Sequence, residues 1–346
     1  MHVRFGRTMF VAGAVALVSL VACGDGGESG GRRSQAPGSP GAGGDGPPAP
    51  YVESMSDSAG FVVVGDTRLY FTAFGAGEPL LVVHGGPGLD QRYMRPWLDG
   101  LQDVARVVYY DQRGTGGSTG PFTAEALHFD QFVEDLDRIR IAMGWERFTV
   151  LGHSWGGILA VDYARLHPER LDGLVLMSTA EPGTRFAAQA AQRSQEARTA
   201  EDQSRIREIM ASEAFAEGAA EAVSEIFRIV FRSTLADPSD IKKLDLALSE
   251  ATARNRNEVT RLLQQGMVQP EWWPDLGNIS VPTLILHGRH DPSPMEMAAA
   301  MADSLPNARL VRLRDSGHFP FAEEPDVVME EIRRFLGEGR SPTRGS

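Results

Sequence analysis

The sequence predicts an α/β domain in which a mostly parallel sheet of eight strands is flanked by helices and interrupted by a helical cap. Short, continuous apolar runs recur along the chain, as is typical of strands buried on both faces. Helical spacing of apolar residues occurs between the runs, and the alternation stops near residue 181 and resumes near residue 280. These observations favour a sheet domain of residues 51–180 and 280–338, with a helical cap of residues 181–279 inserted between its halves.

Eight runs are interpreted as strands. They cover residues 61–64, 68–74, 80–83, 106–110, 148–151, 171–177, 283–287 and 308–313. Between the fourth and fifth runs, Phe132, Leu136, Ile139 and Met143 recur at helical spacing and predict one apolar helix face. From the third run onward, the alternation of strands with helices is typical of a parallel sheet.

The cap contains an acidic repeat with two interpretations. Glu213, Glu217, Glu221 and Glu225 occupy every fourth position, which predicts that they share one helix face. Apolar residues fall on the opposite face, namely Phe215, Ala219, Val223, Ile226, Phe227 and Val230. The acidic face is either simply solvated or an anionic surface above the active site that attracts cationic substrates.

The N-terminal segment 1–22 is interpreted as a signal peptide. Arg4 and Arg7 precede an apolar stretch that runs from Met9 to Ala22. As a helix this stretch would reach about 21 Å, at about 1.5 Å per residue, which is short of a bilayer core of about 30 Å. A permanent membrane span is therefore not expected.

Cys23 is the only cysteine of the chain, and it ends the sequence "LVAC". This sequence resembles the lipobox of bacterial lipoproteins, in which the cysteine is lipidated and becomes the mature N-terminus. Residues 23–50 are rich in Gly, Pro and Ser and are expected to be a disordered tether, and residues 339–346 a disordered tail. We expect export and lipid anchoring through Cys23 on the extracytoplasmic side of a bacterial membrane. An ordinary signal peptide, and a secreted or periplasmic protein, is the alternative.

Composition argues against several classes of protein. The formal net charge of −12 argues against nucleic acid as a partner, because nucleic-acid binding depends on positive charge. No Walker-type "GK" occurs, and "GTGGSTG" at 114–120 has the wrong spacing for a dinucleotide loop. His287 and His290 are three apart in a predicted loop, which makes them a poor metal pair. The sequence therefore implies no cofactor and no metal.

Residues 152–157, "GHSWGG", place Ser154 between a predicted buried strand and a predicted helix. A tight strand-to-helix turn brings backbone segments close together, and glycine at positions 152 and 156 leaves room for that approach. This pattern is typical of a nucleophile elbow, in which the serine hydroxyl is exposed at the end of the sheet. Ser154 is therefore the predicted nucleophile.

A serine nucleophile needs a base, usually a histidine that a carboxylate orients. Asp291 and His318 each follow a predicted strand, and side chains at the carboxyl ends of parallel strands collect at one edge. The chain order Ser154, Asp291, His318 matches the order known for this elbow. Asp315 and Asp111 remain alternative acids.

The other histidines near these motifs receive structural interpretations. His153 is expected to pack, with its ring directed away from the Ser154 hydroxyl. His167 precedes a proline at a helix end, which indicates a capping role.

Acyl transfer also requires donors for the developing oxyanion. The backbone N–H of Trp155 follows the nucleophile directly and is the first predicted donor. The loop "HGGPG" at 84–88 follows a predicted strand and supplies Gly86 as the second. A plain Gly/Pro turn is the alternative interpretation of this loop.

Together these motifs identify a family resemblance. "HGGPG" (84–88), "DQRGTGGS" (111–118), "GHSWGG" (152–157), "HGRHD" (287–291) and "GHFPF" (317–321) resemble an α/β-hydrolase of the proline iminopeptidase type over residues 55–338, apart from the cap. The resemblance implies an α/β-hydrolase fold and an aminopeptidase that removes N-terminal residues, often proline, from short peptides. It assigns Ser154, Asp291 and His318 to the catalytic triad and Gly86 and Trp155 to the oxyanion hole.

The family binds the free amine of its substrate through acidic cap residues. Glu225, Glu250 and Glu258 are the candidates that the resemblance suggests in this chain. Members commonly carry glycine where this chain has His153, and the "GHSxGG" pattern is shared with esterases of the same fold. Three functions follow: an aminopeptidase, a serine hydrolase of esters, lactones or amides, and a non-catalytic surface protein that keeps the fold for binding.

Overall fold

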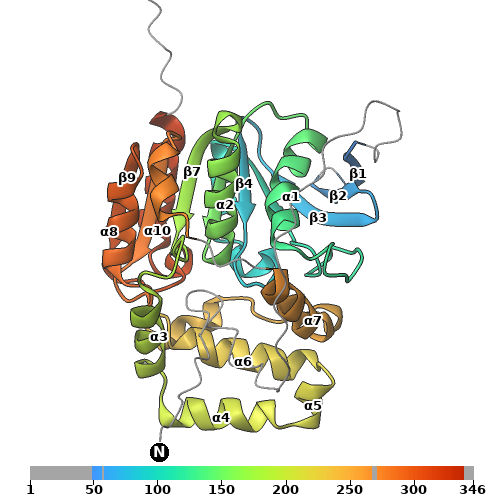
Figure 1. The fold of residues 1–346 in the computed structure, drawn as a ribbon, viewed down its shortest axis with the longest axis vertical. Coiled ribbons are helices and arrows are strands. Elements are labelled where there is room, and N and C mark those ends of the chain that lie inside the picture. The colour runs from blue at the N-terminus through green and yellow to red at the C-terminus, as the bar shows by residue number, and fades with distance from the viewer. Residues whose placement is uncertain (1–48, 57, 267–270, 339–346) are drawn as a thin grey trace, which may run out of the picture.

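The computed structural model describes residues 49–56, 58–266 and 271–338. A single twisted sheet runs through these residues in the order β1-β2-β3-β5-β4-β6-β7-β8-β9 (Figure 1). Its strands are β1 (Tyr51–Ser56), β2 (Ala59–Val64), β3 (Thr67–Phe74), β4 (Pro79–Val83), β5 (Arg106–Tyr110), β6 (Phe148–His153), β7 (Leu171–Met177), β8 (Thr283–Gly288) and β9 (Ala308–Leu313). The pairs from β5 to β9 are parallel, and the pairs among β1, β2, β3 and β5 are antiparallel.

The sheet has one strand more than the eight that the sequence predicts. The additional strand, β1, is an edge strand with the sequence "YVESMS", and five of its six residues are exposed. A polar, exposed edge strand has no continuous apolar run, so the pattern that identifies the buried strands does not reveal it. The eight predicted strands and the mostly parallel α/β architecture are confirmed.

Helices cover both faces of the sheet. They are α1 (Phe129–Ala142), α2 (Trp155–Leu166), α8 (Met295–Ser304), α9 (Pro320–Glu323) and α10 (Pro325–Glu338). Alternate residues of β4 point to opposite faces, so Leu81 joins the cluster formed with α1, α2 and α8, whereas Leu80 joins the cluster formed with α10. The predicted apolar face of α1 is buried at Phe132, Leu136 and Ile139. The sheet therefore lies between two hydrophobic layers, one on each face.

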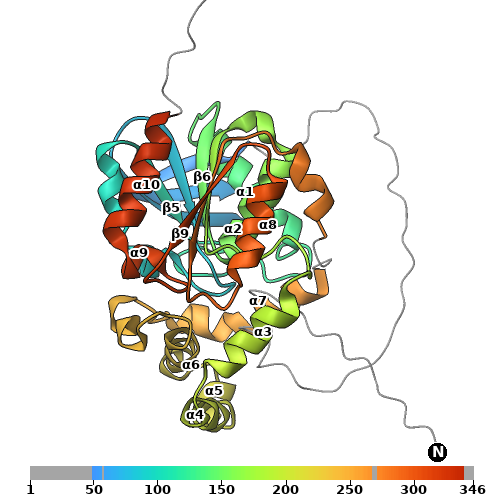
Figure 2. The same cartoon turned by 90° about the vertical axis from the view of Figure 1, so that its left-hand side faces the viewer.

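A helical insertion, residues 178–282, separates β7 from β8 and lies across one end of the sheet (Figures 1 and 2). Its helices are α3 (Ala187–Glu196), α4 (Ala200–Met210), α5 (Glu213–Ala216), α6 (Ala220–Arg232) and α7 (Glu250–Gly266). Helix α6 is strongly amphipathic, and its apolar side chains Val223, Ile226, Phe227 and Val230 are buried.

The predicted single acidic helix face is wrong. Glu213 lies in α5 and Glu217 caps it, whereas Glu221 and Glu225 belong to α6. The chain changes direction between the two helices at Gly218, whose φ of 73° suits glycine. Glu221 pairs with Arg228 at 2.9 Å and Glu225 with Arg205 at 2.7 Å, so these carboxylates form local ion pairs at the surface.

Several predicted segments lie outside the described residues. These are the signal segment 1–22, the lipidation site Cys23, the tether up to residue 48 and the tail 339–346. Within the described part of the chain, every helix is too short or too polar to traverse a bilayer.

Candidate active site

Ser154 stands on a sharp turn between β6 and α2. Its φ of 54° lies in the left-handed region that side chains other than glycine rarely adopt. The turn depends on small neighbours, because a methyl group at Gly156 would lie 2.2 Å from the carbonyl oxygen of Val83. A methyl group at Gly152 would lie 2.4 Å from the carbonyl oxygen of Gly156. Glycine at both positions therefore leaves room for the turn that places Ser154 directly after the end of β6.

A continuous hydrogen-bonded chain joins Ser154, His318 and Asp291. The Ser154 Oγ lies 3.0 Å from His318 Nε2, and His318 Nδ1 lies 2.8 Å from Asp291 Oδ2. An ionised carboxylate only accepts, so His318 Nδ1 carries the proton and Nε2 accepts from the serine hydroxyl. All three side chains are buried. Such a serine can lose its proton as it attacks a carbonyl carbon.

Asp291 is held in its charged form. Burial opposes ionisation, but the charge and hydrogen bond of His318, with the charge of His287, lower the pKa of Asp291 to about 2 overall. Its second oxygen, Oδ1, accepts the Ser293 N–H at 2.8 Å. This bond fixes which carboxylate oxygen faces the imidazole.

The loop that carries His318 is anchored by residues that the sequence analysis did not identify. Glu323, in α9, accepts the N–H groups of Gly317 and Phe319, both at 3.0 Å. The His318 N–H donates to the carbonyl of Thr234, which belongs to the helical insertion, at 2.9 Å. No motif marks either partner, because the two contacts depend on how separate segments pack.

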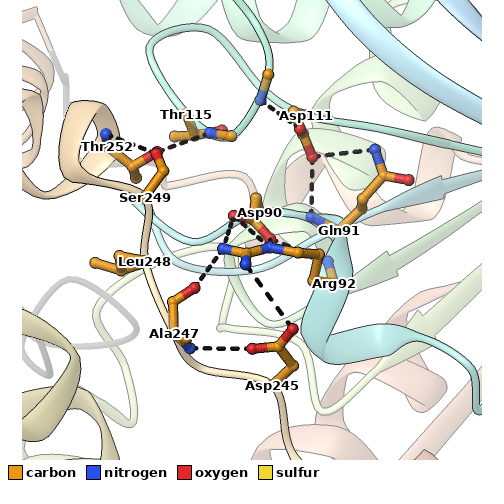
Figure 3. A network of polar contacts seen from close by, with 12 residues as sticks. Asp90, Gln91, Arg92, Asp111, Thr115, Asp245, Ala247, Leu248, Ser249 and Thr252 are labelled. Carbon is orange, nitrogen blue, oxygen red and sulfur yellow. Dashed lines mark hydrogen bonds and ion pairs between the residues drawn. The ribbon is translucent and has the colours of Figure 1, made fainter. Parts of the chain in front are cut away.

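The two alternative acids, Asp315 and Asp111, form hydrogen bonds with residues other than His318. Asp315 is exposed, and its backbone N–H donates to Glu324 at 3.0 Å. Asp111 accepts the Gln91 N–H at 3.1 Å and the Gly117 N–H at 2.8 Å (Figure 3). Burial and the charge of Asp90 raise the pKa of Asp111 to about 6, although its hydrogen bonds oppose the shift. The ion-pair partner of His318 is Asp291.

His153 and His167, the two histidines with predicted structural roles, form different contacts. His167 lies at the C-cap of α2, where its N–H donates to the carbonyl of Tyr163. His153 is buried, and besides packing it forms two polar contacts that the sequence did not indicate, with the Tyr93 hydroxyl and the His318 carbonyl.

The two predicted oxyanion donors flank the serine. Trp155 is the first residue of α2, and the N–H groups of a first helical turn have no acceptor within the helix. Gly86 follows β4, has a φ of 131° and lines one small cavity together with Ser154. Gln112 fixes both elements, because its Nε2 donates to the His84 carbonyl at 2.6 Å and its Oε1 accepts the Trp155 indole N–H at 3.0 Å.

The cavity above Ser154 is small and mainly apolar. Its volume is about 10 Å³, and its apolar wall consists of Leu89, Tyr93, Phe227, Phe231 and Phe319. Phe227 and Phe231 come from α6, so the helical insertion forms the roof. Among the described residues, no carboxylate lines it.

The three carboxylates suggested for amine binding lie elsewhere. Glu225 pairs with Arg205 and Glu258 with Arg261, the latter at 2.5 Å. Glu250 is exposed in the first turn of α7. None of them lines the cavity beside Ser154.

A different carboxylate, Glu181, follows a residue that contacts the elbow, and the sequence analysis missed it. The N–H of Ala180 donates to the Ser154 carbonyl at 3.3 Å, and the next residue is Glu181, which is 7% exposed. One Glu181 oxygen accepts the Phe186 N–H at 2.8 Å, while the other has no hydrogen-bond partner among the described residues. Burial, with the charge of Glu271, raises the pKa of Glu181 to about 7. A buried, incompletely paired carboxylate can bind a cation.

A polar junction fastens the helical insertion to the loops around the site (Figure 3). Arg92 pairs with Asp90 at 2.8 Å, reaches Asp245 at 3.9 Å and donates to the Ala247 carbonyl. The N–H of Gly116 donates to the Thr252 hydroxyl at 3.0 Å. The junction therefore connects the segment before α7, and the first turn of α7, to the loops after β4 and β5.

Among residues 49–56, 58–266 and 271–338, no group of three or more His, Cys, Asp or Glu side chains is arranged to hold a metal ion. The site consists of a serine, an imidazole, carboxylates and backbone donors.

Comparisons with known proteins identify the family of the chain. The family described as the alpha/beta hydrolase fold matches residues 78–325. The proline iminopeptidase of Lactobacillus delbrueckii subsp. bulgaricus is 31% identical over 267 residues, which cover 75% of this chain and 89% of that protein. The proline iminopeptidase of Clostridium botulinum is 27% identical over 285 residues, covering 78% of this chain and 94% of the relative.

Solved structures show the same fold. A thermophilic esterase from Thermogutta terrifontis aligns with a TM-score of 0.59 and 29% identity, covering 80% of this chain and 96% of the esterase. The proline iminopeptidase of Mycobacterium smegmatis aligns with a TM-score of 0.62 and 22% identity, covering 82% of this chain and 98% of that structure. The chain is therefore a hydrolase that belongs to the α/β-hydrolase fold family, with proline iminopeptidases among its relatives.

Proposed function

We propose that this hydrolase is a serine aminopeptidase of the proline iminopeptidase type, which releases N-terminal residues from short peptides through an acyl-enzyme. The observation that carries the proposal is the chain from Ser154 Oγ through His318 to Asp291, with contacts of 3.0 and 2.8 Å. The proline iminopeptidase relatives support the substrate class.

In the proposed reaction, Ser154 Oγ attacks the carbonyl carbon of the N-terminal residue while His318 Nε2 takes the hydroxyl proton. Asp291 stabilises the imidazolium, and the N–H groups of Gly86 and Trp155 stabilise the oxyanion. The carbon–nitrogen bond then breaks, and the imidazolium gives its proton to the leaving amine. Water attacks the acyl-enzyme with the same base, which releases the free amino acid and restores the Ser154 hydroxyl.

Selection of a free N-terminus is the second part of the proposal. We infer that Glu181, with Glu271 beside it, attracts the substrate ammonium, since Glu181 follows the residue that is hydrogen-bonded to Ser154. A blocked N-terminus carries no charge, so it would leave this carboxylate unpaired in a buried setting, which is costly. The aromatic faces of Phe227, Phe231 and Phe319 suit a compact apolar group such as a pyrrolidine ring.

A carboxylesterase, lactonase or amidase is the second candidate function. The apolar cavity wall, which contains no carboxylate among the described residues, favours it, because an uncharged acyl group would need no ammonium partner. Similarity to the Thermogutta terrifontis esterase supports it as well.

Three substrates and one variant separate these functions. Hydrolysis of proline 4-nitroanilide, its N-acetylated form and 4-nitrophenyl butyrate is measured for the parent and for Ser154→Ala. Cleavage of only the free-amine anilide supports the aminopeptidase, and preference for the butyrate supports the esterase. Equal rates for the parent and Ser154→Ala would contradict both.

We also propose that the protein is anchored through a lipid on Cys23 at the extracytoplasmic side of a bacterial membrane. The basis is the sequence "LVAC" at the end of the apolar segment. Labelled palmitate is expected to appear on the parent and not on Cys23→Ser, and the parent alone is expected in the membrane fraction. A labelled Cys23→Ser variant would contradict the proposal.

A further inference from the structure

A buried polar chain runs along the wall of the cavity beside Ser154, and the proposed reaction does not use it. The Gly85 N–H donates to the Tyr93 hydroxyl oxygen at 2.6 Å, and that oxygen lies 2.7 Å from His153 Nδ1. His153 Nε2 lies 2.7 Å from the backbone carbonyl oxygen of His318. The side chains of Tyr93 and His153 are both 1% exposed.

Only one arrangement of protons satisfies every contact in this chain. The His318 carbonyl oxygen can only accept, so His153 Nε2 must carry a proton. Burial, with the charge of His318 as a smaller cause, lowers the pKa of His153 to about 3. The ring is therefore neutral, and Nδ1 is unprotonated. Nδ1 therefore accepts the proton of Tyr93, whose hydroxyl oxygen accepts from Gly85. Burial raises the pKa of Tyr93, so its hydroxyl stays protonated and can donate.

The chain links three segments that are far apart in the sequence. Gly85 adjoins Gly86, His153 adjoins Ser154, and the final acceptor is the backbone of His318 itself. All of these residues line the same cavity. The rings also pack together, because His153 has its centroid 5.1 Å from that of His318 and 5.6 Å from that of Tyr93.

We propose that Tyr93 and His153 are positioning residues, whose buried hydrogen-bonded chain holds the His318 loop and the Gly86 loop in register on either side of Ser154. The inference rests on the proposed serine-hydrolase function. Neither side chain exchanges a proton with the substrate. Each sets where the base and the oxyanion donor stand when the hydroxyl attacks, and displacement of a catalytic group by about 1 Å can cost about 100-fold in rate.

Tyr93→Phe tests the proposal because it removes only the hydroxyl and keeps the ring. The variant leaves the Gly85 N–H without its acceptor and His153 Nδ1 without its donor. For whichever chromogenic substrate the parent hydrolyses, we expect kcat to fall about 10- to 100-fold while KM changes by less than about threefold. Inactivation by a fluorophosphonate, which uses the same base and oxyanion donors, should slow in parallel.

Tyr110→Phe is the matched control. Tyr110 is also 1% exposed, and its hydroxyl has no hydrogen-bond partner among the described residues. Rates are expressed per Ser154 titrated by the fluorophosphonate, so that a smaller folded fraction does not count as a slower enzyme. We expect kcat of Tyr110→Phe to stay within about twofold of the parent.

The outcomes separate the inference from the function on which it rests. If Tyr93→Phe matches Tyr110→Phe while Ser154→Ala is inactive, the positioning role is wrong and the serine hydrolase stands. If the parent neither hydrolyses a substrate nor reacts with the fluorophosphonate, both fail. Should Tyr93→Phe not fold, His153→Gln and His153→Leu decide, since only glutamine can still donate to the His318 carbonyl. A higher kcat for His153→Gln than for His153→Leu supports the proposal, and equal kcat values for the two variants overturn it.

Discussion

Replacing Asp291 by asparagine changes one atom of the site and should disable the base. The Asp291 Oδ1 accepts the Ser293 N–H at 2.8 Å, which fixes the amide oxygen of the new side chain on that side. The amide NH₂ then faces His318 Nδ1, where Oδ2 stood at 2.8 Å. Two donors cannot share this contact, so the imidazole proton moves to Nε2 and points at the Ser154 hydroxyl.

The expected loss of kcat is large. A base whose Nε2 already carries a proton cannot accept another from Ser154, and misplacement of this proton in serine hydrolases costs about 10⁴-fold, or about 5 kcal/mol. Substrate contacts are unchanged, so KM should change by less than about threefold. Steady-state kinetics on the preferred chromogenic substrate, with active-site titration, measure both quantities.

The same substitution has a predicted signature in stability. The pKa of Asp291 is lowered from 3.8 to about 2 in the folded protein, which corresponds to about 2 kcal/mol of stability. A lowered folded pKa stabilises above the unfolded pKa, and the contribution is lost as pH falls through the folded pKa. The difference in unfolding free energy between parent and variant should therefore shrink as pH falls from about 4 towards 2.

Asp315→Asn is the control, because Asp315 lies three residues from His318 but is exposed. Its kcat should stay within about twofold of the parent. The reasoning is refuted if Asp291→Asn keeps more than about a tenth of the parental kcat, or if Asp315→Asn loses as much activity as Asp291→Asn.

Three further predictions concern other parts of the molecule. Gly156→Ala places a methyl group 2.2 Å from the Val83 carbonyl oxygen and should lower the unfolding free energy by about 3 kcal/mol or more. Gly337→Ala is the control, because a methyl group there would have no atom within 4 Å and should not lower the unfolding free energy. Urea unfolding measures both variants. Because the pKa of Glu181 is about 7, binding of an ammonium by its carboxylate should make kcat/KM for proline 4-nitroanilide rise as pH increases through about 7. Glu181→Gln should lower kcat/KM by about 100-fold and make the rise less steep, because the part that depends on an unprotonated His318 remains. An unchanged pH profile would argue against the ammonium role. Arg92→Ala leaves the buried Asp90 carboxylate without its ion pair and should destabilise the protein by about 2 kcal/mol. Proteolysis between residues 233 and 249 should become faster. Equal cleavage rates in parent and variant would contradict the stabilising role of this ion pair.

The parts of the fold that the sequence predicts are those with a strong local signal. Buried parallel strands such as β4 and β6 are continuous apolar runs, and the glycines around Ser154 mark a turn with no room for side chains. Asp291 and His318 could be nominated because parallel strands end at one edge. The edge strand β1 lacks such a run, and the acidic repeat spans the turn at Gly218, which separates α5 from α6.

Other contacts depend on packing between distant segments and left no local signal. Tyr93 meets His153 across 60 positions, and Thr234 meets His318 through backbone atoms alone. Glu181 follows a predicted strand, so its position was available, but its burial beside Glu271 depends on how the insertion returns to the sheet. The glutamates that the resemblance suggests, Glu225, Glu250 and Glu258, do not line the cavity beside Ser154.

The size of the cavity over Ser154 has a kinetic consequence. A volume of about 10 Å³ is about that of a single water-sized probe, whereas any acyl group is several times larger. Since Phe227 and Phe231 form the roof, we expect these side chains or α6 itself to shift when a substrate docks and when the product leaves. If this shift is slower than the chemical step for a given substrate, fast and slow leaving groups should give the same kcat.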